Sequence, residues 1–467
     1  MSDIVDRVIQ RLSEQLPDRV STPGNPRYDA AIAIWAKPVG RFPRAVLHCQ
    51  TTEHVKWGIR VAADWSIPLS VRAGGHDWAG RSLCDGIVID LTGMKDVTVD
   101  RGGRAAVIGG GARASDVAVV MDSLGAAVAA GCCSAVGMAG LTLGGGYGAL
   151  IGRYGLALDN LLAAEVVLAD GRTVVADAEN ESELFWALRG GGGNFGVVTK
   201  MWHRMHDLPS VTTGVLVYPL AEARGILKRC AEIAVSAPDE LTIQLAFAMG
   251  PDGSQVAMVV PNWCGPPHEG EALLAPFSQL GTLLAGRVAA MPYGTSLALF
   301  DGHIVNGLRT FMETCWLPTI EDGSDVLVEA MESAVSPGCA IIVHDFKGAA
   351  SRVPIDATAF ALRHDHMLVE ILAAFVDRSE TGEEERHRQW ALSTRLKLSP
   401  RAFTGGYPNL LASGDVGRAA ISYGRNADRL VEAKRTYDPD NLFRSAIPLP
   451  SAEAPVRHRA RKVIRGY

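Results

Sequence analysis

Apolar and polar positions alternate along the first 200 residues in a pattern that predicts short strands separated by amphipathic helices. Apolar runs of strand length occur at residues 45–49, 69–72, 87–91, 105–108, 165–169, 173–176 and 197–202. Helical spacing of apolar residues occurs at residues 52–65, 115–124 and 182–188. Thr51 or Thr52 can cap the first of these helices, and Asp170-Gly171 is a favoured hairpin turn between two strands. This part of the chain is therefore predicted to be an α+β domain with mixed strands.

The pattern changes near Thr212, where the apolar runs become longer. Strands are predicted at residues 215–218, 242–249, 255–261 and 341–346, with helices at 221–236 and 325–335. This order predicts an antiparallel sheet with helices on one face, as a second domain over residues 211–400. After residue 401 glycines and apolar turns return, and a helix is predicted over residues 426–437. We expect this segment to pack back on the first domain, which then comprises residues 1–210 and 401–467.

Composition and charge exclude several classes of protein. The 467 residues carry a net charge of −6, and the basic stretch at 457–465 reads as a solvated tail, so no nucleic-acid partner is expected. Residues 1–19 mix acids and bases and resemble an amphipathic helix more than a signal peptide. No apolar run approaches the ~20 residues that cross a bilayer. We expect a cytoplasmic protein that is soluble, makes no membrane contact and is a monomer or a homodimer.

The eight cysteines are scattered, without a CxxC pair or a Cys/His spacing suited to zinc. No metal site is therefore predicted, and most of the thiols should be reduced and buried. The adjacent pair Cys132-Cys133 is the exception, because it lies in an unusual glycine-rich segment.

Many of the 50 glycines fall in three clusters before residue 200. The first ends in Gly74-Gly75-His76, where successive backbone N–H groups can cradle a phosphate, although such a turn alone is more often a tight turn with a surface histidine. The second spans residues 131–148 and reads as an apolar loop that needs a planar ring, such as isoalloxazine, to pack on. The third spans residues 190–196. None of them fits a Rossmann fingerprint or a P-loop, which disfavours nicotinamide and ATP enzymes.

Six motifs together make the resemblance specific: RAGGH, a GxCxxVG loop, GGGYG, YGLALDN, ELFWALRGGGGNFGVVT and YDPDNLF. The sequence resembles berberine-bridge-enzyme-like FAD-linked oxidases of the vanillyl-alcohol-oxidase superfamily. It resembles the bacterial branch of this family, which includes 6-hydroxy-D-nicotine oxidase and the sugar and antibiotic-tailoring oxidases, so the substrate could be a secondary metabolite or a sugar. The resemblance covers the whole chain and is strongest over residues 40–205 and 405–445. It implies a two-domain PCMH-type fold, in which the first domain binds FAD and the antiparallel sheet forms the substrate domain.

The resemblance also implies that the flavin is bound covalently. His76 stands where the family joins a histidine to the flavin 8α-methyl group, and Cys133 stands where a cysteine joins flavin C6. A neutral imidazole or a thiolate can add to an electrophilic flavin, and a positive local field would favour the thiolate. The loop departs from the family at Ser134, where proline is usual, and it carries Cys132 beside the expected cysteine.

Further FAD contacts follow from the matched positions. Those expected along the pyrophosphate are Arg72, Ala73, Gly74, Gly75, His76 and Asp77. Those expected along the ring and the ribityl chain are Gly137, Gly140, Gly144 and Gly148, with Asp159 and Asn160 in the turn beside them. Those expected at the adenine side are Asn194, Gly196 and Val198. Val136 stands beside the flavin face where O2 approaches, and a small valine there fits an oxidase.

The catalytic base is less directly indicated, because family members carry YxNY and this chain has Leu410 in place of the second tyrosine. Tyr407 and Asn409 remain as expected flavin contacts, and Tyr147 matches a tyrosine near the substrate, so both tyrosines are candidate catalytic residues. His344 is another candidate base: it shares one strand face with Ile342 and Phe346. If that face covers the flavin, His344 could act near neutral pH, and if not, it is a core histidine with Val343 and Asp345 facing the site.

These observations predict an FAD oxidase whose partners are a small-molecule substrate and O2. An alcohol, hemiacetal or amine carbon would lose hydride to flavin N5, and O2 would be reduced to H2O2. The alternatives are a flavin dehydrogenase on the same fold and a flavin-bearing binding protein without turnover, which the missing second tyrosine would favour.

Overall fold

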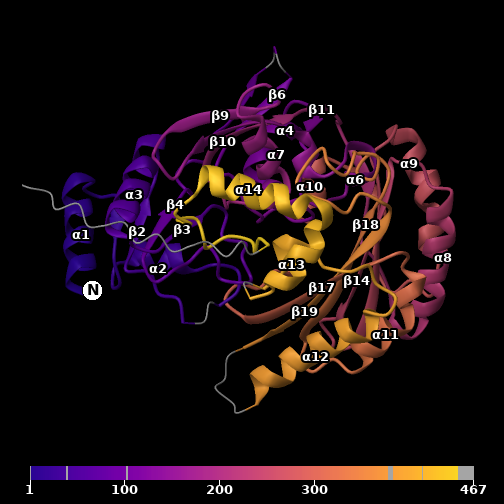
Figure 1. Cartoon of the computed structure of the whole chain (residues 1–467). Coiled ribbons are helices and arrows are strands. Elements are labelled where there is room, and N and C mark those ends of the chain that lie inside the picture. Colours follow the sequence, from indigo (N-terminus) through magenta and orange to yellow (C-terminus); the bar gives the residue numbers. More distant parts are fainter. Residues whose placement is uncertain are drawn as a thin grey trace, which may run out of the picture.

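The computed structural model describes residues 2–37, 40–100, 102, 104–376, 382–412 and 414–450 (Figure 1). The basic stretch at 457–465 lies outside these residues. The fold combines helices with parallel and antiparallel sheets, so the α+β prediction is confirmed.

The N-terminal part begins with a four-stranded sheet in the order β1-β2-β4-β3. Its strands are β1 (Val20–Ser21), β2 (Ala45–His48), β3 (Leu69–Arg72) and β4 (Ile87–Asp90). β4 pairs in parallel with both β2 and β3, and helix α3 (Thr52–Trp65) makes the crossover. Thr51 caps α3 by accepting a hydrogen bond from the His54 backbone N–H, as its position predicts. The strands are mostly buried because they are covered on both faces.

A five-stranded antiparallel sheet follows, in the order β5-β6-β10-β8-β9. Its strands are β5 (Val97–Asp100), β6 (Ala105–Gly109), β8 (Leu161–Val167), β9 (Thr173–Asp177) and β10 (Val197–Arg204). Its core also includes residues of α4 (Ala114–Asp122), α5 (Met138–Gly144) and α7 (Ser182–Gly191). The short strands β7 (Ala126–Ala127) and β11 (His206–Asp207) pair beside it.

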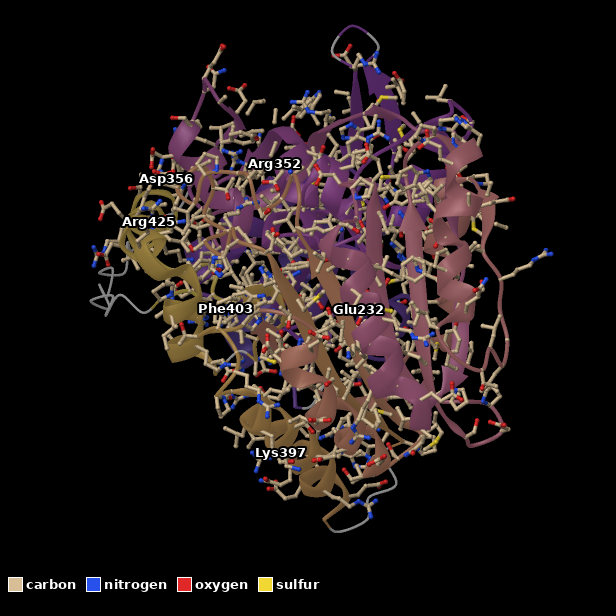
Figure 2. The ribbon with its side chains drawn as sticks, turned by 90° about the vertical axis from the view of Figure 1, so that its right-hand side faces the viewer. Glu232, Arg352, Asp356, Lys397, Phe403 and Arg425 are labelled. Atoms are coloured by element: carbon tan, nitrogen blue, oxygen red, sulfur yellow. The ribbon has the colours of Figure 1, made fainter. Side chains whose placement is uncertain are left out.

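The third layer is an eight-stranded antiparallel sheet built from residues 211 to 375, which has two different faces. Its strands are β12 (Val211–Thr213), β13 (Leu216–Pro219), β14 (Leu241–Met249), β15 (Gln255–Trp263), β16 (Ala289–Met291), β17 (Arg309–Leu317), β18 (Gly338–Phe346) and β19 (His366–Phe375). One face packs on helices α8 (Ala223–Val235), α11 (Ser324–Glu332) and α12 (Glu383–Leu398). Figure 2 shows this helical side, where Glu232 marks α8 and Lys397 marks α12. The other face is turned toward the N-terminal part.

The C-terminal segment returns to the N-terminal part, as expected. Helices α13 (Val416–Tyr423) and α14 (Ala427–Tyr437) lie between the two parts in Figure 1, and α14 packs on α7. Phe443 joins the core beneath the parallel sheet. The remaining helices are α1 (Ser2–Gln15), α2 (Pro26–Ile32), α6 (Ile151–Tyr154), α9 (Pro267–Leu274) and α10 (Tyr293–Leu297). The large sheet and its helices begin close to Thr212, where the pattern of apolar runs in the sequence changes. The domain boundaries themselves stay a prediction.

The glycine-rich stretch at 131–148 corrects one expectation. It is not loop throughout, because residues 138–144 form α5. Gly144 in this helix allows a close approach, since a Cβ atom on it would lie 2.4 Å from Asn409 Cγ. A helix can carry glycine where a neighbour approaches its backbone, at a cost of about 1 kcal/mol per residue relative to alanine.

Two loops of the N-terminal part touch through glycine backbones. A Cβ atom on Gly74 would lie 2.4 Å from Gly137 Cα, and one on Gly137 would lie 2.5 Å from the Gly74 nitrogen. We therefore expect Gly137→Ala to lower the free energy of unfolding by roughly 1–3 kcal/mol, because the backbones must move apart. Urea denaturation measures this. Gly140→Ala is the matched control, since no atom lies within 4 Å of its added Cβ, and an equal loss in both variants would contradict the contact.

Candidate active site

A cavity of about 570 Å³ lies between the touching glycine loops and the open face of the eight-stranded sheet. Its size is within the range of about 300–1,000 Å³ that is typical of ligand pockets. Fifteen of the predicted site residues line it: Ala73, Gly74, Gly75, His76, Asp77, Cys133, Val136, Gly137, Gly140, Tyr147, Gly196, Val198, His344, Tyr407 and Asn409. Segments far apart in the sequence thus converge on one space, and Leu410 also contributes to its wall.

His76 comes two residues after the point where Gly74 contacts Gly137. Gly75 adopts a left-handed backbone with φ of +77°, which turns the chain after β3 and presents His76 to the cavity. The imidazole stacks on Trp35, with ring centroids 4.5 Å apart and planes 4° from parallel. Burial lowers the pKa of His76 to about 4, against the opposing charges of Glu370 and Asp77. The imidazole is therefore neutral at pH 7, which is the nucleophilic form.

Cys133 lies on the same wall, in the loop that Gly137 ends. Burial raises the pKa of the Cys133 thiol to about 12, and Cys132, Asp301 and Glu370 add to the increase. The neighbouring groups are acidic, so they do not supply the positive local field that would favour the thiolate. Cys133 is a protonated thiol in this arrangement.

His344 lies on the cavity face of β18, so the face that the alternation left open is the one carrying Ile342 and His344. Its Nε2 lies 3.2 Å from Glu370 Oε1 on β19, and its Nδ1 lies 3.6 Å from Cys132 Sγ. Burial would lower the pKa of His344, but the charges on Glu370 and Cys132 outweigh it and raise the pKa to about 10. The expectation of a pKa suited to a neutral-pH base is therefore corrected: His344 is an imidazolium held by Glu370.

Tyr147 is fixed in a buried hydrogen-bond network. Nδ1 of His366 donates to the His364 carbonyl at 2.7 Å, and burial lowers the pKa of His366 to about 3, so its Nε2 is unprotonated. The Tyr147 hydroxyl therefore donates to this Nε2 at 2.8 Å, and it accepts the Trp316 indole N–H at 3.2 Å. Burial raises the pKa of Tyr147 well above its usual value. Tyr147 is thus a protonated tyrosine rather than a base.

Tyr407, like Tyr147, is buried and hydrogen-bonded. Its hydroxyl accepts the Gly146 backbone N–H at 2.9 Å, and its ring meets that of Tyr147 edge-on with centroids 5.0 Å apart. Burial raises the pKa of Tyr407 as well. Both tyrosines therefore position the wall of the cavity and remain protonated at neutral pH.

Six predicted residues do not line the large cavity: Arg72, Gly144, Gly148, Asp159, Asn160 and Asn194. They hold the loops around it instead. Arg72 pairs with Asp90 at 3.2 Å, and Asp159 receives two hydrogen bonds from Arg363 at 2.8 and 2.9 Å. Gly144 approaches Asn409, and Gly148 approaches the Ala130 carbonyl and lines a smaller neighbouring pocket.

The two asparagines are also structural. Asn160 donates to the Tyr154 and Leu156 carbonyls at 2.8 and 2.9 Å. Asn194 donates to the Gly191 and Ile447 carbonyls at 2.8 and 2.9 Å and so ties the third glycine cluster to the C-terminal segment.

Several cavity residues escaped the sequence reasoning. Trp35 precedes the first predicted strand, Glu370 lies within an apolar run, and Arg81 is one of many arginines. Arg81 is buried and donates to the Asn409 carbonyl at 2.9 Å, but its Nε and Nη2 have no partner among the described residues. A buried guanidinium with unused donors favours an anionic ligand in the cavity.

Comparison with known proteins identifies two domains and several relatives. Residues 43–177 match the model described as FAD binding domain, and residues 412–450 match the one described as berberine and berberine like. The (R)-6-hydroxynicotine oxidase of Paenarthrobacter nicotinovorans is 28% identical over 437 residues, covering 90% of this chain and 94% of that protein. An FAD-linked oxidoreductase of Bacillus subtilis is 28% identical over 445 residues, covering 93% and 97%. The protein is an FAD-linked oxidoreductase that carries an FAD binding domain and a berberine-like C-terminal segment.

Solved structures agree with this assignment. The chain matches 6-hydroxy-D-nicotine oxidase from Arthrobacter nicotinovorans with a TM-score of 0.83 at 26% identity, over 92% of this chain and 97% of that one. A xylooligosaccharide oxidase from Myceliophthora thermophila shares the fold, with a TM-score of 0.81 at 22% identity over 96% and 100%. The predicted PCMH-type FAD-binding fold is confirmed, and the protein is an FAD-linked oxidoreductase.

The cavity of this oxidoreductase fits FAD on observations of its own. The unused Arg81 donors suit a diphosphate, and the Trp78 indole N–H, also at the cavity, has no partner among the described residues. Gly140 and Gly193 line open space in which an added Cβ would meet nothing within 4 Å. None of the helices in the described part of the chain is long and apolar enough to cross a membrane.

Proposed function

We propose that the protein is an FAD-dependent oxidase that carries its flavin covalently and oxidises an alcohol, hemiacetal or amine carbon of a small molecule. The observation that carries the proposal is the convergence of His76, Cys133 and the His344–Glu370 pair on one cavity. When bound, FAD supplies the two-electron oxidation of the substrate and the transfer of those electrons to O2, which gives H2O2.

The roles of the residues follow from their protonation and position. Arg81 and the backbone of residues 73–77 would hold the diphosphate, and neutral His76 would be the first attachment point. Cys133 is the second, and its thiol must lose a proton before it can bond. Glu370 is the group placed to accept the proton of a substrate hydroxyl or amine, while the imidazolium of His344 fixes its orientation. Val136 leaves room for O2 beside this site.

The substrate-facing wall favours an apolar small molecule. Its cavity face on the sheet consists largely of Ala246, Ala248, Met258, Met312, Ile342 and Leu372. The names of the relatives indicate substrates of two kinds, a hydroxynicotine and oligosaccharides. An apolar wall that carries the His344–Glu370 pair suits a hydroxynicotine-like substrate better than an oligosaccharide, because a sugar hydroxyl needs several polar partners.

Turnover with a substrate panel tests the oxidase reaction. We expect peroxide to form in a 1:1 ratio with consumed O2 when the protein meets apolar alcohols or cyclic amines, and little with oligosaccharides. Peroxide assay and an oxygen electrode measure both quantities. Substrate oxidation that needs an artificial electron acceptor would make the protein a dehydrogenase, and no oxidation across the panel would favour a binding protein.

A further inference from the structure

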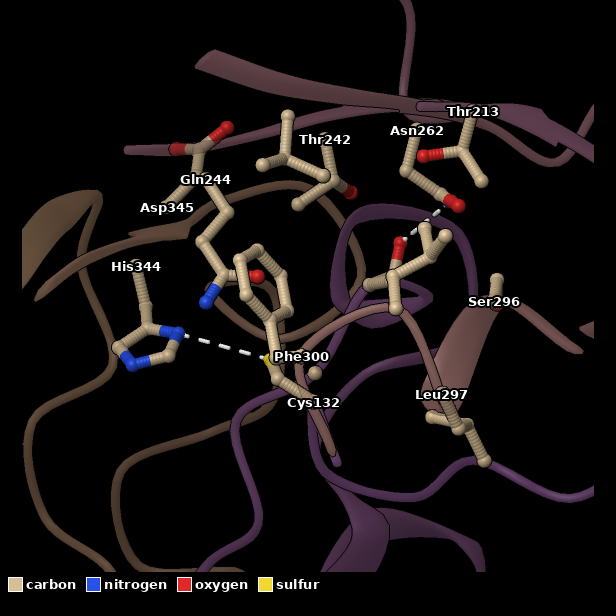
Figure 3. A pocket seen from close by; sticks show the side chains of 14 residues that line it. Cys132, Thr213, Thr242, Gln244, Asn262, Ser296, Leu297, Phe300, His344 and Asp345 are labelled. Atoms are coloured by element: carbon tan, nitrogen blue, oxygen red, sulfur yellow. Dashed lines mark hydrogen bonds between the residues drawn. The ribbon is translucent and has the colours of Figure 1, made fainter. Parts of the chain in front are cut away.

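Cys132 has a contact that the oxidation reaction does not use. Its Sγ lies 3.6 Å from His344 Nδ1 (Figure 3). The opposite ring nitrogen lies 3.2 Å from Glu370 Oε1. The imidazole therefore stands between a thiol and a carboxylate. Cys132 comes from the glycine-rich loop, whereas the other two groups come from β18 and β19, so only the folded chain assembles the three.

This order of groups is the one that activates a nucleophile. A carboxylate on one imidazole nitrogen favours the protonated ring, and a protonated ring beside sulfur favours the thiolate. The raised pKa of His344, to about 10, agrees with this arrangement. Burial raises the pKa of the neighbouring Cys133 thiol to about 12. Of these two adjacent cysteines, only Cys132 lies against the imidazole.

The surroundings of Cys132 indicate the kind of molecule that reaches it. Cys132 is half-buried and lines both the large cavity and a smaller pocket beyond it, as do Gln244 and His344 (Figure 3). The sheet wall of the large cavity is mostly apolar, as described above. No group of three or more His, Cys, Asp or Glu side chains in the described part of the chain is placed to hold a metal ion. An apolar carbon electrophile is therefore the reactant that suits this thiolate.

We propose that Cys132 is a nucleophile that adds to apolar α,β-unsaturated carbonyl compounds entering the cavity, with His344 and Glu370 as its positioning pair. The sulfur forms a bond to the β-carbon, and the electron pair of the carbon–carbon double bond moves toward the carbonyl oxygen. The proton on His344 Nδ1 then passes to the resulting enolate. The addition changes no oxidation state and needs no second reactant. It goes beyond the proposed oxidase reaction and is independent of turnover.

Labelling of the holoenzyme with N-phenylmaleimide, an apolar conjugated carbonyl compound, tests the proposal. We expect a single adduct on Cys132, found by peptide mass spectrometry, with a rate that is nearly flat between pH 6 and 8. Glu370→Gln and His344→Asn should slow the labelling at pH 6 at least tenfold. Cys84→Ser is the matched control, because Cys84 is a free cysteine that does not line the cavity, and it should leave the Cys132 rate within about twofold.

Other outcomes overturn the proposal. Labelling of Cys133 or Cys84 in preference to Cys132 would do so, as would a wild-type rate that rises tenfold for each pH unit. An unchanged rate in Glu370→Gln would remove the positioning pair. Circular dichroism and flavin absorbance show whether each variant is folded, and if His344→Asn is not, Glu370→Gln and the wild-type pH profile decide the question.

Discussion

Flavin should stay with the acid-precipitated wild-type protein and with either single variant, His76→Ala or Cys133→Ala, and should be released only from the double variant. Each attachment alone is a covalent bond, so loss of one leaves the cofactor tethered. Absorbance of the pellet and supernatant measures the release. Mass spectrometry of the flavin-bearing peptides then assigns each bond to its residue.

The two proposed flavin bonds differ in how reactive the attaching side chain is. His76 is a neutral imidazole on a rigid turn, whereas Cys133 is a protonated thiol among acidic groups. A colourless wild-type pellet would end the covalent proposal. If Cys133→Ala changes neither the flavin spectrum nor the peptide mass, the second bond is absent. Asp77→Asn is a suitable control, because it changes a cavity residue without removing an attachment point.

Removing either member of the His344–Glu370 pair should stop substrate oxidation while leaving flavin in place. We expect His344→Ala and Glu370→Gln each to slow anaerobic flavin reduction by roughly 10²–10⁴-fold, the usual contribution of a positioned proton acceptor. Stopped-flow absorbance measures the rate, and flavin content is read from the same spectrum. Normal reduction in His344→Ala would remove that residue from catalysis, and normal reduction in Glu370→Gln would remove the carboxylate as base.

The same pair makes a pH-dependent contribution to stability. The pKa of His344 rises from 6.5 to about 10 on folding, so the folded protein binds the proton more tightly. The resulting stabilisation is full below pH 6.5 and is lost as the pH rises through about 10. The deficit in unfolding free energy of Glu370→Gln should therefore shrink between pH 7 and 10. A deficit that is constant over this range would contradict the ion pair.

The local pattern of the sequence was sufficient for much of the fold. The helix at 52–65 and the strand at 69–72 have the predicted bounds, because caps, turns and apolar spacing all agree there. β17 and β19 were not predicted, although they are long. β19 lies inside the large sheet with one face on the helices and the other on the cavity, so its apolar run lacks the alternation of a half-exposed strand. β17 is the edge strand beside it, and its sequence mixes polar and apolar residues without a clear strand pattern.

The site shows the same division between local and long-range information. His76 and Cys133 lie in motifs that are continuous in the sequence, and they could be named from them. Glu370 lies in an apolar run, and its role depends on its contact with His344, which lies diagonally opposite on the paired strand. Trp35 likewise reaches His76 through a contact that no spacing encodes. Residues that act through tertiary contacts were the ones missed.

Single strands of the large sheet carry two sets of side chains with different roles. On β14, β18 and β19 every second side chain faces the cavity, while the intervening ones pack against α8, α11 and α12. Exchange of the cavity-facing set therefore alters the shape offered to a ligand and leaves the helix-covered core intact. Ligand preference in this scaffold can diversify by substitution at alternate positions, without a matching drift in folding stability.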